Sequence, residues 1–238
     1  MSARPQATAA ISYPDSDGKP MADNTKQFRW IVTIKENLEI LFANDPDVFI
    51  AGDLLWYPVE GNNKLRYAPD VMVAFGRPKG DRGSYRQWLE DNIAPQVVFE
   101  ILSPGNRPAE MTKKAMFYQR YGVEEYYLYD PDTNDLTGWH WKFAEPGQGK
   151  ILEINAEISD LDTWVSPRLG IRFELTKDTL IIFGPNGEPF LTPVELVQQR
   201  DEAQQQRDEA QQQRDEAQQR ADILAAKLRE LGIDPETL

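Results

Sequence analysis

The sequence contains no cysteine and only one histidine, His140. Without cysteine the chain has no disulfide, no thiolate zinc site and no cysteine nucleophile. A single histidine excludes a metal site built from several imidazoles, and any Ser-His-Asp arrangement would depend on His140. If the chain binds a metal ion, its ligands are oxygen atoms, which favours Mg²⁺, Mn²⁺ or Ca²⁺.

Positive charge is also scarce. The chain has 26 Lys and Arg residues against 39 Asp and Glu residues, for a net charge of −13. Residues 199–238 carry 6 basic and 10 acidic side chains, so residues 1–198 retain a net charge of −9. This balance argues against broad electrostatic binding of nucleic acid, and any contact with DNA requires a local basic patch or bound cations.

Long hydrophobic runs are missing as well. No apolar stretch reaches the roughly 18 residues of a membrane span, and residues 1–10 lack the basic-then-apolar plan of a signal peptide. We therefore expect a cytoplasmic protein with no membrane contact. With 40% hydrophobic residues the chain can bury one proper core. We expect a flexible lead-in at residues 1–20, a folded domain at 21–185, a linker at 186–195, a helix at 196–232 and a tail at 233–238.

The apolar spacing predicts an α/β domain. A helix begins at Asn24 or Thr25 and runs to about Ala43, and two strands, 48–57 and 66–75, form an antiparallel pair. Residues 96–102 form a buried strand, 107–121 a helix capped by Gly122, and 126–129 a second buried strand. A strand, a helix and a strand in succession form a crossover, which makes these two strands neighbours in one mixed sheet.

Further segments complete the expected domain. Residues 137–143 and 151–154 are expected to form a hairpin, and residues 164–183 one or two short strands. The loop at 77–93 gathers Lys79, Arg82 and Arg86, which suits contacts to an anionic ligand or simply a solvated surface.

Residues 199–219 consist of three copies of the heptad Gln-Arg-Asp-Glu-Ala-Gln-Gln. A period of seven predicts a long helix with a coiled-coil seam on which Ala203, Ala210 and Ala217 share one position. Glu202 precedes Arg207 by five residues, the spacing of ion pairs between the helices of a parallel dimer. We therefore expect a homodimer or another protein partner through residues 196–232, the alternative being a solitary solvated helix.

Asp70 and Glu100 are acids within two apolar strands of one expected sheet. A buried charge costs several kcal/mol unless it is paired, and two adjacent carboxylates repel each other unless a cation offsets them. This argument favours a Mg²⁺ site, with a nearby lysine to neutralise charge in the transition state. The alternatives are a turn role for Asp70 and an arginine partner for Glu100. Glu110 also suits the first turn of a helix, where it could pair with Lys114.

Several segments, taken in order, resemble the Uma2 family, endonucleases of the PD-(D/E)xK restriction-endonuclease-like superfamily that are common in cyanobacteria. The resemblance covers roughly residues 20–185 and rests on Ala68-Pro69-Asp70-Val71, residues 98–104, Lys114 with Tyr118, and residues 121–127. Residues 228–235 also resemble the end of these proteins. The family implies a restriction-endonuclease-like core with a central mixed sheet flanked by helices, Mg²⁺ or Mn²⁺ dependence, and phosphodiester hydrolysis in DNA.

Carried over by position, Asp70 and Glu100 are the metal-binding acids. The superfamily usually has lysine two residues after the second acid. Here that residue is Leu102, and Lys114 on the following helix matches instead, with Glu110 as an accessory acid. The leading hypothesis is a Mg²⁺-dependent endonuclease with catalytic residues Asp70, Glu100 and Lys114. The alternatives are an inactive nuclease fold that recruits partners through its C-terminal helix, and an esterase using Ser103 and His140.

Overall fold

The structure, a computed structural model, describes residues 11–16, 18, 22–142, 158 and 160–230. The chain divides into two compact units, Met1–Phe190 and Leu191–Leu238. The first unit is built on a five-stranded mixed sheet of order β1-β3-β5-β6-β7. Its strands are Val48–Gly52, Val71–Phe75, Val97–Ile101, Glu125–Asp130 and Asp135–His140. β5 and β6 are parallel neighbours, and every other pair is antiparallel, which confirms the expected crossover.

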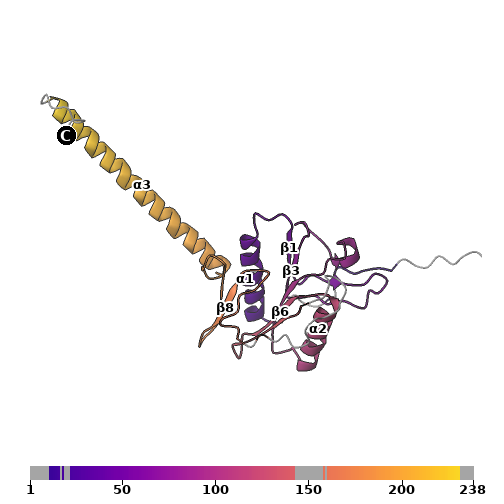
Figure 1. The fold of residues 1–238 in the computed structure, drawn as a ribbon. Helices are drawn as coiled ribbons and strands as arrows, with labels where there is room; N and C mark the ends of the chain where they lie inside the picture. The colour runs from indigo at the N-terminus through magenta and orange to yellow at the C-terminus, as the bar shows by residue number, and fades with distance from the viewer. Residues whose placement is uncertain (1–10, 17, 19–21, 143–157, 159, 231–238) are drawn as a thin grey trace, which may run out of the picture. The chain divides into compact units, whose positions relative to one another are not determined.

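Two helices flank this sheet (Figure 1). Helix α1, Thr25–Leu41, begins where the side chain of Asn24 accepts a hydrogen bond from the N–H of Gln27, an N-cap that satisfies a first-turn donor. Helix α2, Pro108–Tyr121, starts with proline and ends at Gly122, whose φ of 103° is the left-handed conformation that glycine adopts without strain. Both helices have the expected cap, and α1 ends two residues before the expected Ala43.

The pleat of the strands sorts their side chains between the two helices. On β3 and β5, Val71, Val73, Phe99 and Ile101 pack in one core with α1. The alternate residues of the sheet, which include Met72, Val98 and Tyr126, pack in a second core with Phe117 and Tyr118 of α2. Because successive side chains of a strand point to opposite faces, residue 100 must point toward α2. The fold therefore places the acid of β5 beneath the helix that carries Lys114.

The first expected strand, 48–57, is interrupted in the structure. β1 ends at Gly52, and Asp53 adopts a φ of +49°, a left-handed conformation that turns the chain out of the sheet. The next residues form β2, Trp56–Tyr57, which pairs in parallel with β4, Tyr85–Arg86, as a separate two-stranded sheet. The expected strand 66–75 also starts late, at Val71, because Tyr67 bridges to Trp56 instead.

The remaining elements of the first unit are short. A 3₁₀ turn, Gln87–Leu89, follows β4. β8, Arg172–Leu175, and β9, Leu180–Phe183, form an antiparallel hairpin, as expected for residues 164–183. β7 pairs with β6, whereas its other expected partner, 151–154, lies outside the described residues.

The expected linker at 186–195 is shorter in the structure. Pro189 still bridges to Phe183, and the N–H of Phe190 donates to the carbonyl of Ile182 at 2.7 Å. Helix α3, Pro193–Glu230, begins three residues before the expected 196. Within the described residues, no helix is both long and apolar enough to cross a membrane.

Glu125 is a second fully buried acid, and it ties β6 to the segment before β8. Its carboxylate accepts hydrogen bonds from the hydroxyls of Tyr127 and Ser166 and from the N–H of Arg168, the last at 2.8 Å. The neighbouring Glu124 is instead partly exposed and pairs with the Arg168 guanidinium at 2.6 Å. Two adjacent glutamates thus hold the same segment from inside and from outside the core.

We predict that Glu125→Ala lowers the free energy of unfolding by about 3 kcal/mol or more, because it leaves three buried donors without an acceptor. Glu124→Ala is the matched control and is expected to lower it by about 1 kcal/mol or less, since its ion pair is exposed. Urea denaturation of both variants measures the difference. Equal losses would show that Glu125 does not hold the segment as described.

Candidate active site

Asp70 and Glu100 face each other across two neighbouring strands. The register of β3 with β5 pairs Val71 with Phe99, and continuing it by one residue sets Asp70 opposite Glu100. Asp70 is 7% exposed and Glu100 2% exposed. The backbone N–H of Ile101 donates to Asp70 Oδ2 at 2.6 Å, which fixes that carboxylate against β5. The two acids predicted as metal ligands therefore lie side by side on the α2 face of the sheet.

Helix α2 supplies both partners of Glu100. Lys114 Nζ donates to Glu100 Oε2 at 2.8 Å, and the hydroxyl of Tyr118 donates to Glu100 Oε1. Lys114 and Tyr118 are four residues apart, so they lie on the same helix face, one turn after the other. The expected alternative of an arginine partner for Glu100 is wrong, and Lys114 pairs with Glu100 rather than with Glu110.

Burial and charge shift the pKa values of this cluster strongly. Burial, together with the negative charge of Glu100, raises the pKa of Asp70 to about 8, despite the opposing effects of the Ile101 hydrogen bond and of Lys114. Burial lowers the pKa of Lys114, but the carboxylate of Glu100 outweighs it, and the net shift is upward. Lys114 is therefore a cation at neutral pH, whereas Asp70 holds a proton when no other cation is present.

A cavity of about 820 Å³ opens above these residues and is lined by Asp53, Asp70, Glu110 and Lys114. Glu110 lies one helical turn before Lys114, and both side chains line the same cavity. This position is compatible with the accessory role expected for Glu110. Glu100 does not line it, because Lys114 and Tyr118 cover its carboxylate. The structure thus brings together all four residues singled out in the sequence, with Glu100 beneath the surface of the cavity.

Sequence reasoning assigned no role to Tyr118 itself and passed over Asp53. The signal for Tyr118 was its position four residues after Lys114, on the same helix face. Asp53 was read as part of a continuous strand. Its N–H in fact donates to the carbonyls of Pro69 at 3.1 Å and Asp70 at 3.3 Å. Asp53 therefore anchors the backbone of Asp70.

The donor set suits a hard divalent cation. Among the described residues, no three Asp, Glu or His side chains form a cluster around one point. Mg²⁺ does not require one, since it is commonly held by one or two carboxylates and completes its shell with water and substrate phosphates. Two facing carboxylates, one of which takes up a proton when no other cation is present, are such a pair. The oxygen atoms of Asp70 and Glu100 therefore fit Mg²⁺ or Mn²⁺.

The cations of the 77–93 loop are engaged elsewhere. Arg77 and Arg82 both bond to Glu90, at 3.1 and 2.7 Å, and Lys79 bonds to Glu39 at 3.1 Å. Arg86 lies 3.6 Å from Asp15. The pairs with Glu90 lie within the loop, whereas Lys79 ties the loop to α1. Each of these cations thus has a carboxylate nearby, which favours the alternative of a solvated surface loop.

We predict that the metal-free protein loses stability as the pH rises from about 4 to about 8. Asp70 keeps its proton up to a pKa of about 8 in the folded state but releases it near 3.8 when unfolded, so the folded state binds more protons in this window. Asp70→Asn keeps an acceptor for Ile101 without the ionisable group, and should raise the melting temperature more at pH 8 than at pH 5. Calorimetry in EDTA measures this. An equal gain at both pH values would contradict it.

Comparison with known proteins identifies the family of the chain. No curated protein sequence matches the chain. A crystal structure from Anabaena variabilis, described as "a putative nuclease belonging to DUF820", is 17% identical and covers 63% of this chain and 78% of its own, with a TM-score of 0.42. The Uma2 family model, described as "Putative restriction endonuclease", matches residues 17–176. Since this match spans more than half of the sequence and includes the whole cluster around Glu100, the chain belongs to the Uma2 family.

Proposed function

We propose that this protein is a Mg²⁺- or Mn²⁺-dependent endonuclease that hydrolyses phosphodiester bonds in DNA. The observation that carries the proposal is the pair Asp70 and Lys114 at the wall of an open cavity, with Glu100 directly beneath them and its Oε2 2.8 Å from Lys114 Nζ. Membership of a family described as restriction endonucleases supports phosphodiester hydrolysis as the reaction.

Each residue has a separate task in this proposal. Asp70 and Glu100 would hold the divalent cation, which would supply Lewis-acid activation of water and of the phosphoryl group when bound. Tyr118 keeps the Glu100 carboxylate oriented through its hydrogen bond. Lys114 remains protonated, because its pKa is raised. It therefore serves as a positive charge that orients the attacking water and neutralises charge developing on the phosphate, and not as a general base. Glu110 supports the cation or the lysine from the cavity wall.

An anionic substrate is compatible with the acidic chain because of where its cations lie. Lys64 and Arg66 line the same cavity as Asp70 and Lys114. Arg66 donates to the carbonyl of Asn63 at 2.9 Å and to the hydroxyl of Tyr57 at 3.4 Å, neither of which is an acid. Within the described part of the chain, neither Lys64 nor Arg66 has a carboxylate partner. Both are therefore available to phosphates on either side of the scissile bond.

We predict that the purified protein nicks plasmid DNA with Mg²⁺ or Mn²⁺, and that Asp70→Ala and Glu100→Ala abolish nicking. Lys114→Met should lower the rate by about 10²-fold or more, since it removes one electrostatic stabiliser of the transition state. Glu174→Ala, an exposed acid on β8, is the control and should retain full activity. Full activity in the Asp70 and Glu100 variants would indicate a contaminating nuclease and refute the proposal.

We also propose that α3 forms a parallel two-stranded coiled coil. None of its described residues is buried within the chain. The helix is supported along its length by hydrogen bonds between glutamines and acids four residues later, such as Gln204 to Asp208 and Gln211 to Asp215, each at 2.8 Å. These bonds leave Arg207 and Glu202 available for pairing with a second helix.

A protein truncated after residue 195 should then be a monomer by light scattering, whereas the full-length protein should have the mass of a dimer. The reason is that the heptad alanines and the Glu202 to Arg207 spacing, which suit self-association, would be removed. An unchanged oligomeric mass after truncation would exclude α3 as the dimer contact.

A further inference from the structure

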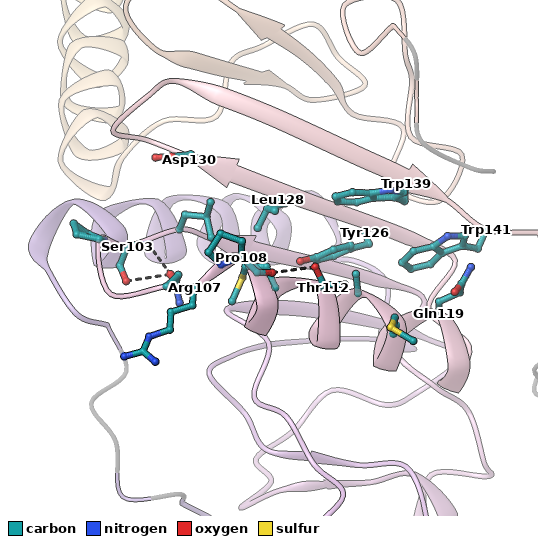
Figure 2. Close-up of a pocket in the computed structure, with 16 residues that line it drawn as sticks. Ser103, Arg107, Pro108, Thr112, Gln119, Tyr126, Leu128, Asp130, Trp139 and Trp141 are labelled. Carbon is teal, nitrogen blue, oxygen red and sulfur yellow. Dashed lines mark hydrogen bonds between the residues drawn. The ribbon is translucent and has the colours of Figure 1, made fainter. Parts of the chain in front are cut away.

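A second cavity, of about 760 Å³, lies between α2 and the outer strands β6 and β7 (Figure 2). The reaction proposed above uses none of the side chains that line it. Its wall is largely apolar, with Met111, Ala115 and Met116 from α2 facing Leu128 and Trp139 from the sheet. We call it the α2–β7 cavity.

Three aromatic rings form one side of this cavity (Figure 2). The ring of Tyr126 lies nearly parallel to that of Trp139, at 5.0 Å and 16°, and to that of Trp141, at 6.1 Å and 18°. Tyr126 is 0% exposed, and among the described residues its hydroxyl has no hydrogen-bond partner. A buried hydroxyl without a partner is costly, and native structures seldom keep one without a reason. The Tyr126 hydroxyl lies beneath this wall, and the flat aromatic surface suits a planar ligand with apolar faces.

The opposite end of the cavity carries two charged residues, Arg107 before α2 and Asp130 at the end of β6 (Figure 2). The Asp130 carboxylate accepts hydrogen bonds from the N–H groups of Asp132 and Thr133, at 2.9 and 3.3 Å. No carboxylate in the described part of the chain pairs with the Arg107 guanidinium. No side chain caps the N-terminus of α2, so its free N–H groups add to the charge of Arg107, while Glu110 in the first turn faces the other cavity. The cavity thus combines an aromatic wall with an anion-binding end, which is the chemistry of a nucleotide.

The cavity also adjoins the candidate active site. Asn106 lines both cavities, and α2 presents Glu110 and Lys114 to one and Met111 and Ala115 to the other. A strand whose phosphate lies above Asp70 therefore has a neighbouring nucleotide within reach of the second cavity.

We propose that the α2–β7 cavity binds one nucleotide of the substrate strand, with its base against Trp139 and its phosphate at Arg107. A base inside a duplex is stacked on both sides and paired, so it cannot enter. The inference rests on the proposed function and narrows it: the substrate carries unpaired nucleotides beside the cleaved bond, as a single strand, flap or loop does.

The test is direct binding by the full-length protein in EDTA, measured by fluorescence anisotropy with a labelled 12-nucleotide single strand of DNA and with a blunt hairpin duplex of the same sequence. The single strand should bind more tightly. Trp139→Leu should weaken single-strand binding by about 5- to 150-fold, the range that corresponds to loss of one base–aromatic stack, and leave duplex binding unchanged. Trp88→Leu, a tryptophan outside the cavity, should change neither.

A second matched pair guards against misfolding of the tryptophan variant. Met116 lines the cavity and is 65% exposed, while Leu89 is 66% exposed and lies outside it. Met116→Glu should weaken single-strand binding about tenfold, because it places a negative charge beside the bound strand, and Leu89→Glu should not. Arg107→Ala should reduce the salt dependence of single-strand binding by about one phosphate contact.

Equal affinity for duplex and single strand, or no effect of Trp139→Leu and Met116→Glu, would overturn the inference. So would a change in oligomeric mass in these two variants, since it would identify a second copy of the chain as the occupant. Because binding is measured without a divalent cation, the two proposals fail separately. Trp139-dependent binding without cleavage would refute the proposed nuclease activity and leave the proposed binding site standing. Cleavage that requires Glu100 but is unchanged in Trp139→Leu would support the nuclease activity and refute the binding site.

Discussion

The facing carboxylates of Asp70 and Glu100 are the constraint on which the site depends. Their strands pair in register, so the two acids are neighbours inside the domain, and burial makes their mutual repulsion expensive. Lys114 and the Tyr118 hydroxyl donate hydrogen bonds to Glu100, and the N–H of Ile101 donates one to Asp70. Asp70 still takes up a proton when no other cation is present. In the function proposed above, a divalent cation would offset this repulsion.

Helix α2 links this constraint to the surface of the molecule. Residues on one side of the helix, Lys114 and Tyr118, reach the acids, and residues on the adjacent side, Met111 and Ala115, line the α2–β7 cavity. Since both sets belong to one rigid helix, the two cavities have a fixed spacing. That rigidity matters for an enzyme, because reacting groups have to be held within a fraction of an ångström of their productive positions.

The positive charges of this acidic chain differ in whether a carboxylate neutralises them. The arginines and the lysine of the 77–93 loop are neutralised by Glu90, Glu39 and Asp15, so they add little positive field. Lys64, Arg66 and Arg107 have no carboxylate partner in the described part of the chain, and they line the two cavities. Net charge therefore understates the local attraction for phosphate, which depends on unpaired cations near the site rather than on their total number.

The sequence alone determined the elements and the candidate residues. The apolar runs, the Gly122 cap and the strand–helix–strand succession correctly predicted α1, α2 and the parallel pair β5–β6, because these signals are local. Family resemblance then favoured a catalytic role for Lys114 over a simple ion pair with Glu110 on the helix surface. Tertiary structure decided the break at Asp53, the bond from Tyr118, the covering of Glu100 and the pairing of the loop cations. Each of these depends on contacts between distant parts of the chain, and no periodicity within one segment encodes such contacts.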